Sequence, residues 1–185
     1  MLEAFFVSTG VVALGEIGDK TQLLALMLAS RYRRPWTIVG GILAATIVNH
    51  TLAGAIGQWV RSVVPESWLR WFLALSLFAV AVWTLKPDRV EESDIPASGM
   101  SVFTVTAVSF FLAEMGDKTQ IATALLAARF DSLVQVVAGT TLGMLLADVP
   151  AVFAGHLAAQ RLPLKPIRAL AASLFVGLGV WVLLT

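Results

Sequence analysis

The sequence predicts an all-α membrane protein whose six transmembrane helices form two inverted three-helix repeats. Hydrophobic residues make up 58% of the 185 residues and charged residues only 14%, against roughly 25% charged in soluble proteins. Six mostly apolar stretches alternate with short polar breaks, and each is close to the roughly 20 residues that cross a bilayer. The third observation is that the second half of the chain repeats the first.

Prolines and basic residues set the expected helix ends, because proline cannot continue a helix and restricts the residue before it. We expect a first helix over residues 2–30, retained rather than cleaved as a signal peptide because no basic segment precedes it. The polar segment 86–100 is predicted to be an acidic linker between repeats 1–85 and 101–185. The other expected helices cover residues 36–60, 68–85, 101–128, 134–157 and 167–184.

The internal repeat is clearest in one motif. A shift of 98 residues aligns Glu16–Gln22 with Glu114–Gln120, and six of the seven positions are identical. Each unit would contain an odd number of helices, so the second unit must insert upside down, as in many secondary transporters. The same shift, without a gap, pairs Arg31 with Arg129, Gly41 with Gly139, Gly57 with Gly155, Arg70 with Arg168, and Trp83 with Trp181.

Basic residues predict the orientation. Eight lie on the side of the loops after the first, third and fifth helices, three lie on the other side, and two lie within helices. By the positive-inside rule, the central linker is cytoplasmic and both termini are outside.

Each motif places acids near the middle of the membrane. Glu16 and Glu114 lie about 14 residues from their helix ends, where a charge costs at least ~2.5–3.5 kcal/mol. Residues three apart share one helix face, so each repeat would present a Glu, an Asp and a Gln together. The candidate metal ligands are Glu16, Asp19, Gln22, Glu114, Asp117 and Gln120.

These oxygen donors suit a hard divalent cation such as Mn²⁺, Ca²⁺ or Mg²⁺. Cysteine is absent, which excludes thiolate ligands. Four carboxylates and the two ammonium groups of Lys20 and Lys118 leave a formal charge of −2, which one divalent cation or two protons would neutralise. The hydroxyls of Thr21 and Thr119 point off the acidic stripe but could add donors.

Further polar residues lie near the middle of the second and fifth expected helices. Asp148 is the repeat counterpart of His50. It is either an auxiliary ligand or proton carrier, with His50 as relay, or a residue that simply pairs with Lys20, Lys118 or His50. Asn49 is expected to make a helix–helix hydrogen bond.

The doubled Glu-x-Gly-Asp-Lys-Thr, at Glu16–Thr21 and Glu114–Thr119, resembles the family of Ca²⁺/Mn²⁺ cation–proton exchangers. That family includes Golgi, chloroplast and bacterial manganese transporters and is distantly similar to the lysine-exporter superfamily. The resemblance implies export of Mn²⁺, with Ca²⁺ as the other ion, in exchange for protons. It implies that the motif acids bind the ion. Within that family, the lack of an N-terminal targeting extension leads us to expect a plasma (inner) membrane protein and not an organellar one.

The alternative function is export of a small organic solute such as an amino acid, whose carboxylate Lys20 and Lys118 would bind. An enzyme is disfavoured because no Ser–His dyad or His-rich motif is present, and no resident cofactor is expected. The absence of a basic run argues against nucleic acid as a partner. The expected partners are the ion, protons and the lipid bilayer, and the residues leave open whether the chain forms a homo-oligomer.

Overall fold

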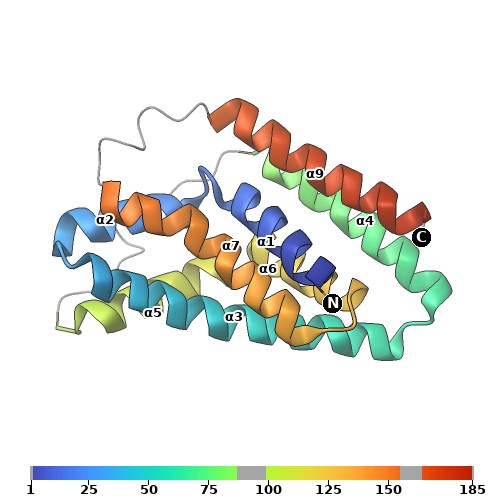
Figure 1. Ribbon diagram of the computed structural model, residues 1–185, viewed down its shortest axis with the longest axis horizontal. Helices are drawn as coiled ribbons and strands as arrows, with labels where there is room; N and C mark the ends of the chain where they lie inside the picture. The colour runs from blue at the N-terminus through green and yellow to red at the C-terminus, as the bar shows by residue number, and fades with distance from the viewer. Residues whose placement is uncertain (1, 87–98, 155–163, 185) are drawn as a thin grey trace.

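The computed structural model describes residues 2–86, 99–154 and 164–184, and within these ranges it is helical with no strand (Figure 1). Most of the predicted acidic linker, including Glu91, Glu92 and Asp94, lies outside them. The helices are α1 (Leu2–Glu16), α2 (Lys20–Tyr32), α3 (Pro35–Val63), α4 (Glu66–Thr84), α5 (Val102–Glu114), α6 (Lys118–Arg129), α7 (Leu133–Ala154) and α9 (Leu164–Leu184).

The prediction of continuous first and fourth helices is wrong. Each is broken inside its motif, between α1 and α2 and between α5 and α6. Gly18 and Gly116 both adopt φ +78°, a left-handed conformation that costs residues other than glycine roughly 1–2 kcal/mol. At both glycines the chain leaves the helix altogether.

Four helices of the described chain are long and apolar enough to cross a membrane. They lie at Pro35–Val63, Glu66–Thr84, Leu133–Phe153 and Lys165–Leu184, close to the predicted second, third, fifth and sixth helices. The four half-helices have 12 to 15 residues each, so each is too short to span alone.

The duplication is visible in the packing of helices. Helix α1 packs on α7, and its counterpart α5 packs on α3, so each broken helix lies against the long helix of the other half. Glycines make both crossings close. A Cβ on Gly41 would lie 3.0 Å from the carbonyl oxygen of Phe103, and one on Gly139 would lie 2.4 Å from that of Phe5. Exchanging the two repeats converts one pair into the other, because Gly41 and Gly139 are 98 residues apart, as are Phe5 and Phe103.

Apolar side chains form two clusters. One joins buried residues of α4, α6 and α9 with part of α1, and the other joins residues of α2, α3 and α5 with part of α7. Among the half-helices, α1 contributes buried residues to both clusters, α6 to the first, and α2 and α5 to the second. Their inner ends meet in the middle of the molecule.

The crossing of α3 and α6 gives a stability prediction. A Cβ on Gly57 would lie 2.0 Å from the carbonyl oxygen of Ala124, so Gly57→Ala should force the helices apart. We expect a loss of about 1–3 kcal/mol or more, seen as a lower unfolding temperature in detergent. Gly177→Ala is the control, because nothing lies within 4 Å of its Cβ and alanine favours helix by up to about 1 kcal/mol. Equal unfolding temperatures for both variants would contradict the crossing.

Candidate metal site at the two helix breaks

Four acids are buried where the half-helices meet. Glu16 is the last residue of α1 and Glu114 the last of α5, while Asp19 and Asp117 occupy the N-cap positions of α2 and α6. None of the four is more than 2% exposed. Helix C-terminal ends carry partial negative charge and exposed carbonyls, so the ends of α1 and α5 add to the attraction for a cation.

The lysines connect the two halves of the chain. Lys20 Nζ lies 3.1 Å from Asp117 Oδ1, and Lys118 makes the reciprocal ion pair with Asp19. The simpler arrangement, an i,i+4 pair of Glu16 with Lys20 inside one helix, is not what forms. The lysines differ in exposure, since the Lys20 side chain is 24% exposed and the Lys118 side chain 4%.

The threonines do not point away from the acids as the helical spacing predicted. Thr21 donates its hydroxyl to Glu16 Oε2, and Thr119 Oγ1 donates to Glu114 Oε2 over 2.8 Å. The break turns the second residue of α2 and of α6, Thr21 and Thr119, back toward the glutamate that ends the preceding half-helix. Each glutamate therefore has one oxygen fixed by a threonine.

The glutamine side chains form hydrogen bonds with the backbone at the two helix breaks. Gln22 Oε1 accepts from the backbone N–H of Gly18 over 2.9 Å, and Gln120 Oε1 accepts from that of Gly116 over 2.7 Å. Their amide nitrogens donate to equivalent positions of the two repeats. Gln22 donates to the Ala147 carbonyl over 3.0 Å. Gln120 donates over 3.2 Å to the side chain of Asn49, which is the repeat counterpart of Ala147.

Asn49 also donates to the Phe111 carbonyl over 3.0 Å. It thus makes the helix–helix hydrogen bonds that were predicted for it, joining α3 to both α5 and α6.

The acids leave donor oxygens for a cation. One oxygen from each of Glu16, Asp19 and Asp117 lies within 4.8 Å of the other two. Among the described residues, Glu16 Oε1 and Glu114 Oε1 are buried and have no hydrogen-bond partner. Buried polar atoms are nearly always satisfied, and a bound cation would satisfy these. Glu114 is not part of the closest trio, although it repels Asp19 and Asp117 electrostatically.

Asp148 on α7 belongs to the same cluster. It is fully buried, and it lies close enough to Glu16 and Asp19 for Coulomb repulsion. Within the described ranges neither of its oxygens has a hydrogen-bond partner, and it forms no ion pair with Lys20 or Lys118. His50 is equally buried, with both ring nitrogens unpartnered among the same residues. The alternative in which Asp148 merely pairs with a lysine or with His50 is therefore not what the structure contains.

Arg168 was not recognised as a site residue from the sequence. Its guanidinium donates to the carbonyl oxygen of Gly18, at the first break, over 3.3 Å. The only signal was its match with Arg70 in the repeat, which gave no indication of a partner.

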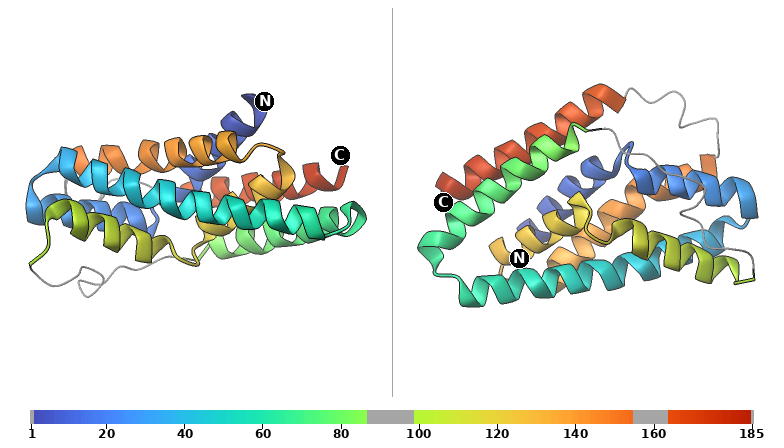
Figure 2. Two further views of the ribbon diagram at one scale, coloured as in Figure 1. Left: turned by 90° about the horizontal axis from the view of Figure 1, so that it is seen from below. Right: turned by 180° about the vertical axis from the view of Figure 1, so that it is seen from behind.

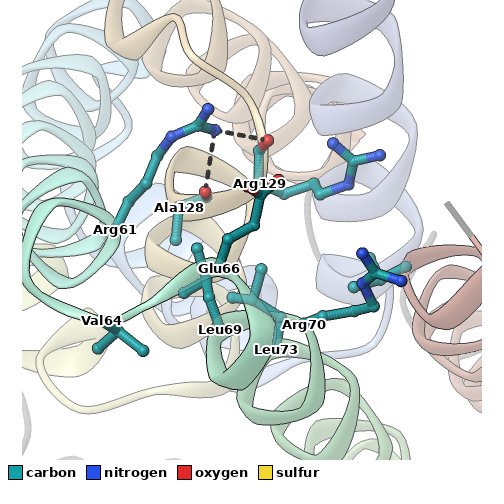
Figure 3. A pocket seen from close by; sticks show the side chains of 9 residues that line it. Arg61, Val64, Glu66, Leu69, Arg70, Leu73, Ala128 and Arg129 are labelled. Carbon is teal, nitrogen blue, oxygen red and sulfur yellow. Dashed lines mark hydrogen bonds between the residues drawn. The ribbon is translucent and has the colours of Figure 1, made fainter.

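A polar cavity of about 270 Å³ lies away from the acids, at the end of the bundle where α3 meets α4 (Figure 3). It is lined by Arg61, Arg70, Arg129 and Glu66 among others. Arg61 Nη1 donates to the carbonyls of Ala128 and Arg129 over 3.3 and 3.0 Å. With three guanidinium groups, this cavity is unsuited to a metal ion.

Comparisons with known proteins agree with this chemistry. The family described as Divalent cation/proton antiporter GDT1 matches residues 4–92 and 102–185. A Vibrio cholerae protein named "Putative manganese exporter" is 47% identical over 178 residues, covering 95% of this chain and 88% of its own length. A GDT1-like protein of Synechocystis is 30% identical, covering 95% of this chain and 94% of its own length.

Arabidopsis thaliana GDT1-like protein 5 is 26% identical over 223 residues, covering 100% of this chain and 97% of its own length. No solved structure matches the chain. The matched ranges include both motifs and all of the described helices except the first two residues of α1. This chain is therefore a member of the GDT1 family of divalent cation/proton antiporters, which are transporters and not enzymes.

Proposed function

We propose that this chain exports Mn²⁺, with Ca²⁺ as a second ion, in exchange for protons, and that the ion binds at the two helix breaks. The observation that carries the proposal is the buried trio of Glu16, Asp19 and Asp117, whose oxygens lie within 4.8 Å of one another. Carboxylates and carbonyls are the donors that Mn²⁺ and Ca²⁺ prefer. Mn²⁺ is placed first because the Vibrio cholerae relative carries that ion in its name.

Each site residue has a role. Glu16, Asp19, Glu114 and Asp117 bind the ion, and Lys20 and Lys118 hold the aspartates while the site is empty. Thr21 and Thr119 orient the glutamates. Gln22 and Gln120 shape the breaks, and each amide oxygen, which has two lone pairs, keeps one for the ion.

Proton exchange follows from the charge of the cluster. Five buried carboxylates, including Asp148, face two lysines, so the cluster has an excess of negative charge when ionised. A divalent cation offsets most of the excess, and protons can replace it. Asp148 is the proton carrier in this proposal, since it is buried without a cationic partner among the described residues, and His50 is its relay.

The membrane arrangement completes the proposal. Each pair of half-helices crosses the bilayer as one broken span, which makes six spans in repeats 1–85 and 101–185. In support, α1 and α5 approach the centre from opposite ends of the bundle, as inverted repeats require (Figure 1). The start of α1 and the end of α9 lie toward the same end of the bundle (Figure 2), and we place that end outside the plasma membrane, with the linker in the cytoplasm.

The test is Mn²⁺ movement in proteoliposomes with an imposed pH gradient. We expect Mn²⁺ to accumulate against its own gradient, and the accumulation to collapse when an ionophore removes the pH difference. Ca²⁺ is measured in parallel. Downhill flux alone, insensitive to the pH gradient, would contradict proton exchange.

The variant Asp148→Asn distinguishes the residue that carries the proton from those that bind the metal. It should still bind Mn²⁺ but lose uphill accumulation. Asp131→Asn, at an exposed position, is the matched control and should transport as the wild type does. Unchanged uphill transport by Asp148→Asn would remove Asp148 as the proton carrier.

A further inference from the structure

Helices α4 and α9 pack asymmetrically on a symmetrical core. The two helices lie side by side along one flank of the bundle (Figure 2). Helix α4 packs on α6, and α9 packs on α1. Exchanging the two repeats turns these contacts into α9 on α2 and α4 on α5, and among the described residues neither of these pairs packs to a comparable extent. The α4–α9 pair therefore occupies one of two places that the duplicated core offers.

The arginines show the same asymmetry. Arg168 on α9 donates to the Gly18 carbonyl, and Gly18 is buried. Its counterpart Arg70 on α4 is exposed and lines the polar cavity, across from Arg61 (Figure 3). Gly116, the counterpart of Gly18, is also exposed.

A second pair of counterparts repeats the pattern. The Phe175 ring of α9 lies 3.8 Å from the Cβ position of Gly15, next to the buried Glu16. Its counterpart on α4, Leu77, lines a narrow gap with Leu125 of α6 instead of lying beside Ala113, the counterpart of Gly15. Two independent contacts thus show α9 engaged at the first break and α4 displaced from the second.

We propose that α4 and α9 shift together along the core during exchange, and that Arg168 and Arg70 alternately bind the carbonyls of Gly18 and Gly116. This inference rests on the proposed antiport function and assigns two positioning residues to it. In the second conformation Arg70 donates to Gly116 O, Leu77 lies beside Ala113, and Arg168 is released.

The pair can move as one body because its two helices are closely packed. A Cβ on Gly179 of α9 would lie 2.6 Å from the Phe78 ring of α4. The shift replaces the hydrogen bond from Arg168 to the Gly18 carbonyl by the equivalent one from Arg70 to the Gly116 carbonyl. Because the two bonds are of the same kind, the two conformations differ little in free energy. A nearly balanced pair of states is what a small difference in ligand affinity can shift.

The experiment uses reducible thiol cross-linking, for which the chain offers a background without cysteine. Gly15→Cys with Phe175→Cys reports the conformation described here, and Ala113→Cys with Leu77→Cys reports its counterpart. We expect both pairs to react with a short bis-methanethiosulfonate in proteoliposomes. Each cross-link should stop Mn²⁺ exchange, and reduction should restore it. If Gly15→Cys itself lowers transport, Leu77→Cys with Leu125→Cys reports the first conformation.

Two matched variants supply a readout that a purely structural role would not give. Arg168→Gln should raise the Ala113–Leu77 cross-link relative to the Gly15–Phe175 cross-link by about tenfold, as expected for loss of one charged hydrogen bond. Arg70→Gln should change the same ratio in the opposite direction.

Mn²⁺ protection against thermal unfolding tests the metal site separately and should persist in both arginine variants. If Mn²⁺ protects neither these variants nor the wild type, the proposed function fails. If Mn²⁺ protects all of them but the Ala113–Leu77 pair never reacts, or both ratios stay unchanged, the movement of α4 and α9 is refuted while the metal site stands.

Discussion

Replacing Glu16 by glutamine should abolish Mn²⁺ exchange, lowering flux by more than about 100-fold, because altering even an outer partner of a metal ligand costs 10–100-fold. The amide keeps the size of the side chain and can still accept from Thr21, so the break should be undisturbed. The variant loses the oxygen, Oε1, that is buried without a hydrogen-bond partner. Flux is measured in proteoliposomes beside the wild type.

The same substitution should act in the opposite sense on the stability of the metal-free protein. Glu16 is repelled by Glu114 and Asp117, so removing its charge relieves repulsion inside the cluster. We expect an equal or higher unfolding temperature without metal and little further rise when Mn²⁺ is added.

Glu3→Gln is the matched control, since Glu3 is exposed in the first turn of α1. It should leave both transport and metal protection at wild-type values. If Glu16→Gln retained flux and metal protection, the ion would have to bind elsewhere.

Much of this arrangement could be predicted from the sequence because it depends on composition and spacing. Runs of apolar residues predicted the four long helices, with ends within a few residues of those observed. The doubled motif identified the four acids that the structure buries together. Repetition at a constant shift paired Gly41 with Gly139, and both glycines lie at close helix crossings.

The local backbone at the motifs could not be predicted from helical periodicity. A spacing of three places Glu16, Asp19 and Gln22 on one face only if the helix is continuous, and Gly18 interrupts it. The break turns Thr21 toward Glu16 and directs the Gln22 oxygen to the backbone. Glycine permits this conformation but does not require it, so tertiary contacts decide whether the helix kinks or ends.

Long-range partners were also beyond the sequence. The lysines could have paired within their own motifs, at positions four residues apart, yet each pairs with the aspartate of the other repeat. That choice depends on how α2 and α6 approach each other. The contact of Arg168 with Gly18 is of the same kind, because it depends on where α9 lies along the core.

Lys118→Met should strongly destabilise the metal-free protein. Lys118 and Asp19 form a buried ion pair in which neither side chain is more than 4% exposed. Removing one partner of such a pair leaves a buried charge and typically costs 3–5 kcal/mol. We expect a marked fall in unfolding temperature without metal. Lys20→Met is the matched control, and it should have a smaller effect because the Lys20 side chain is 24% exposed.

Added Mn²⁺ should reverse much of that loss, because the variant cluster carries one more uncompensated negative charge and a divalent cation offsets it. The rise in unfolding temperature with Mn²⁺ should therefore be larger for Lys118→Met than for the wild type. Transport should be slower, since a more tightly held ion leaves more slowly. An exporter of amino acids would behave in the opposite way, because its lysines would hold the substrate carboxylate, and their loss would abolish substrate protection while Mn²⁺ had no effect. The sign of the Mn²⁺ effect on Lys118→Met thus separates a lysine that balances charge in a metal site from one that binds a solute.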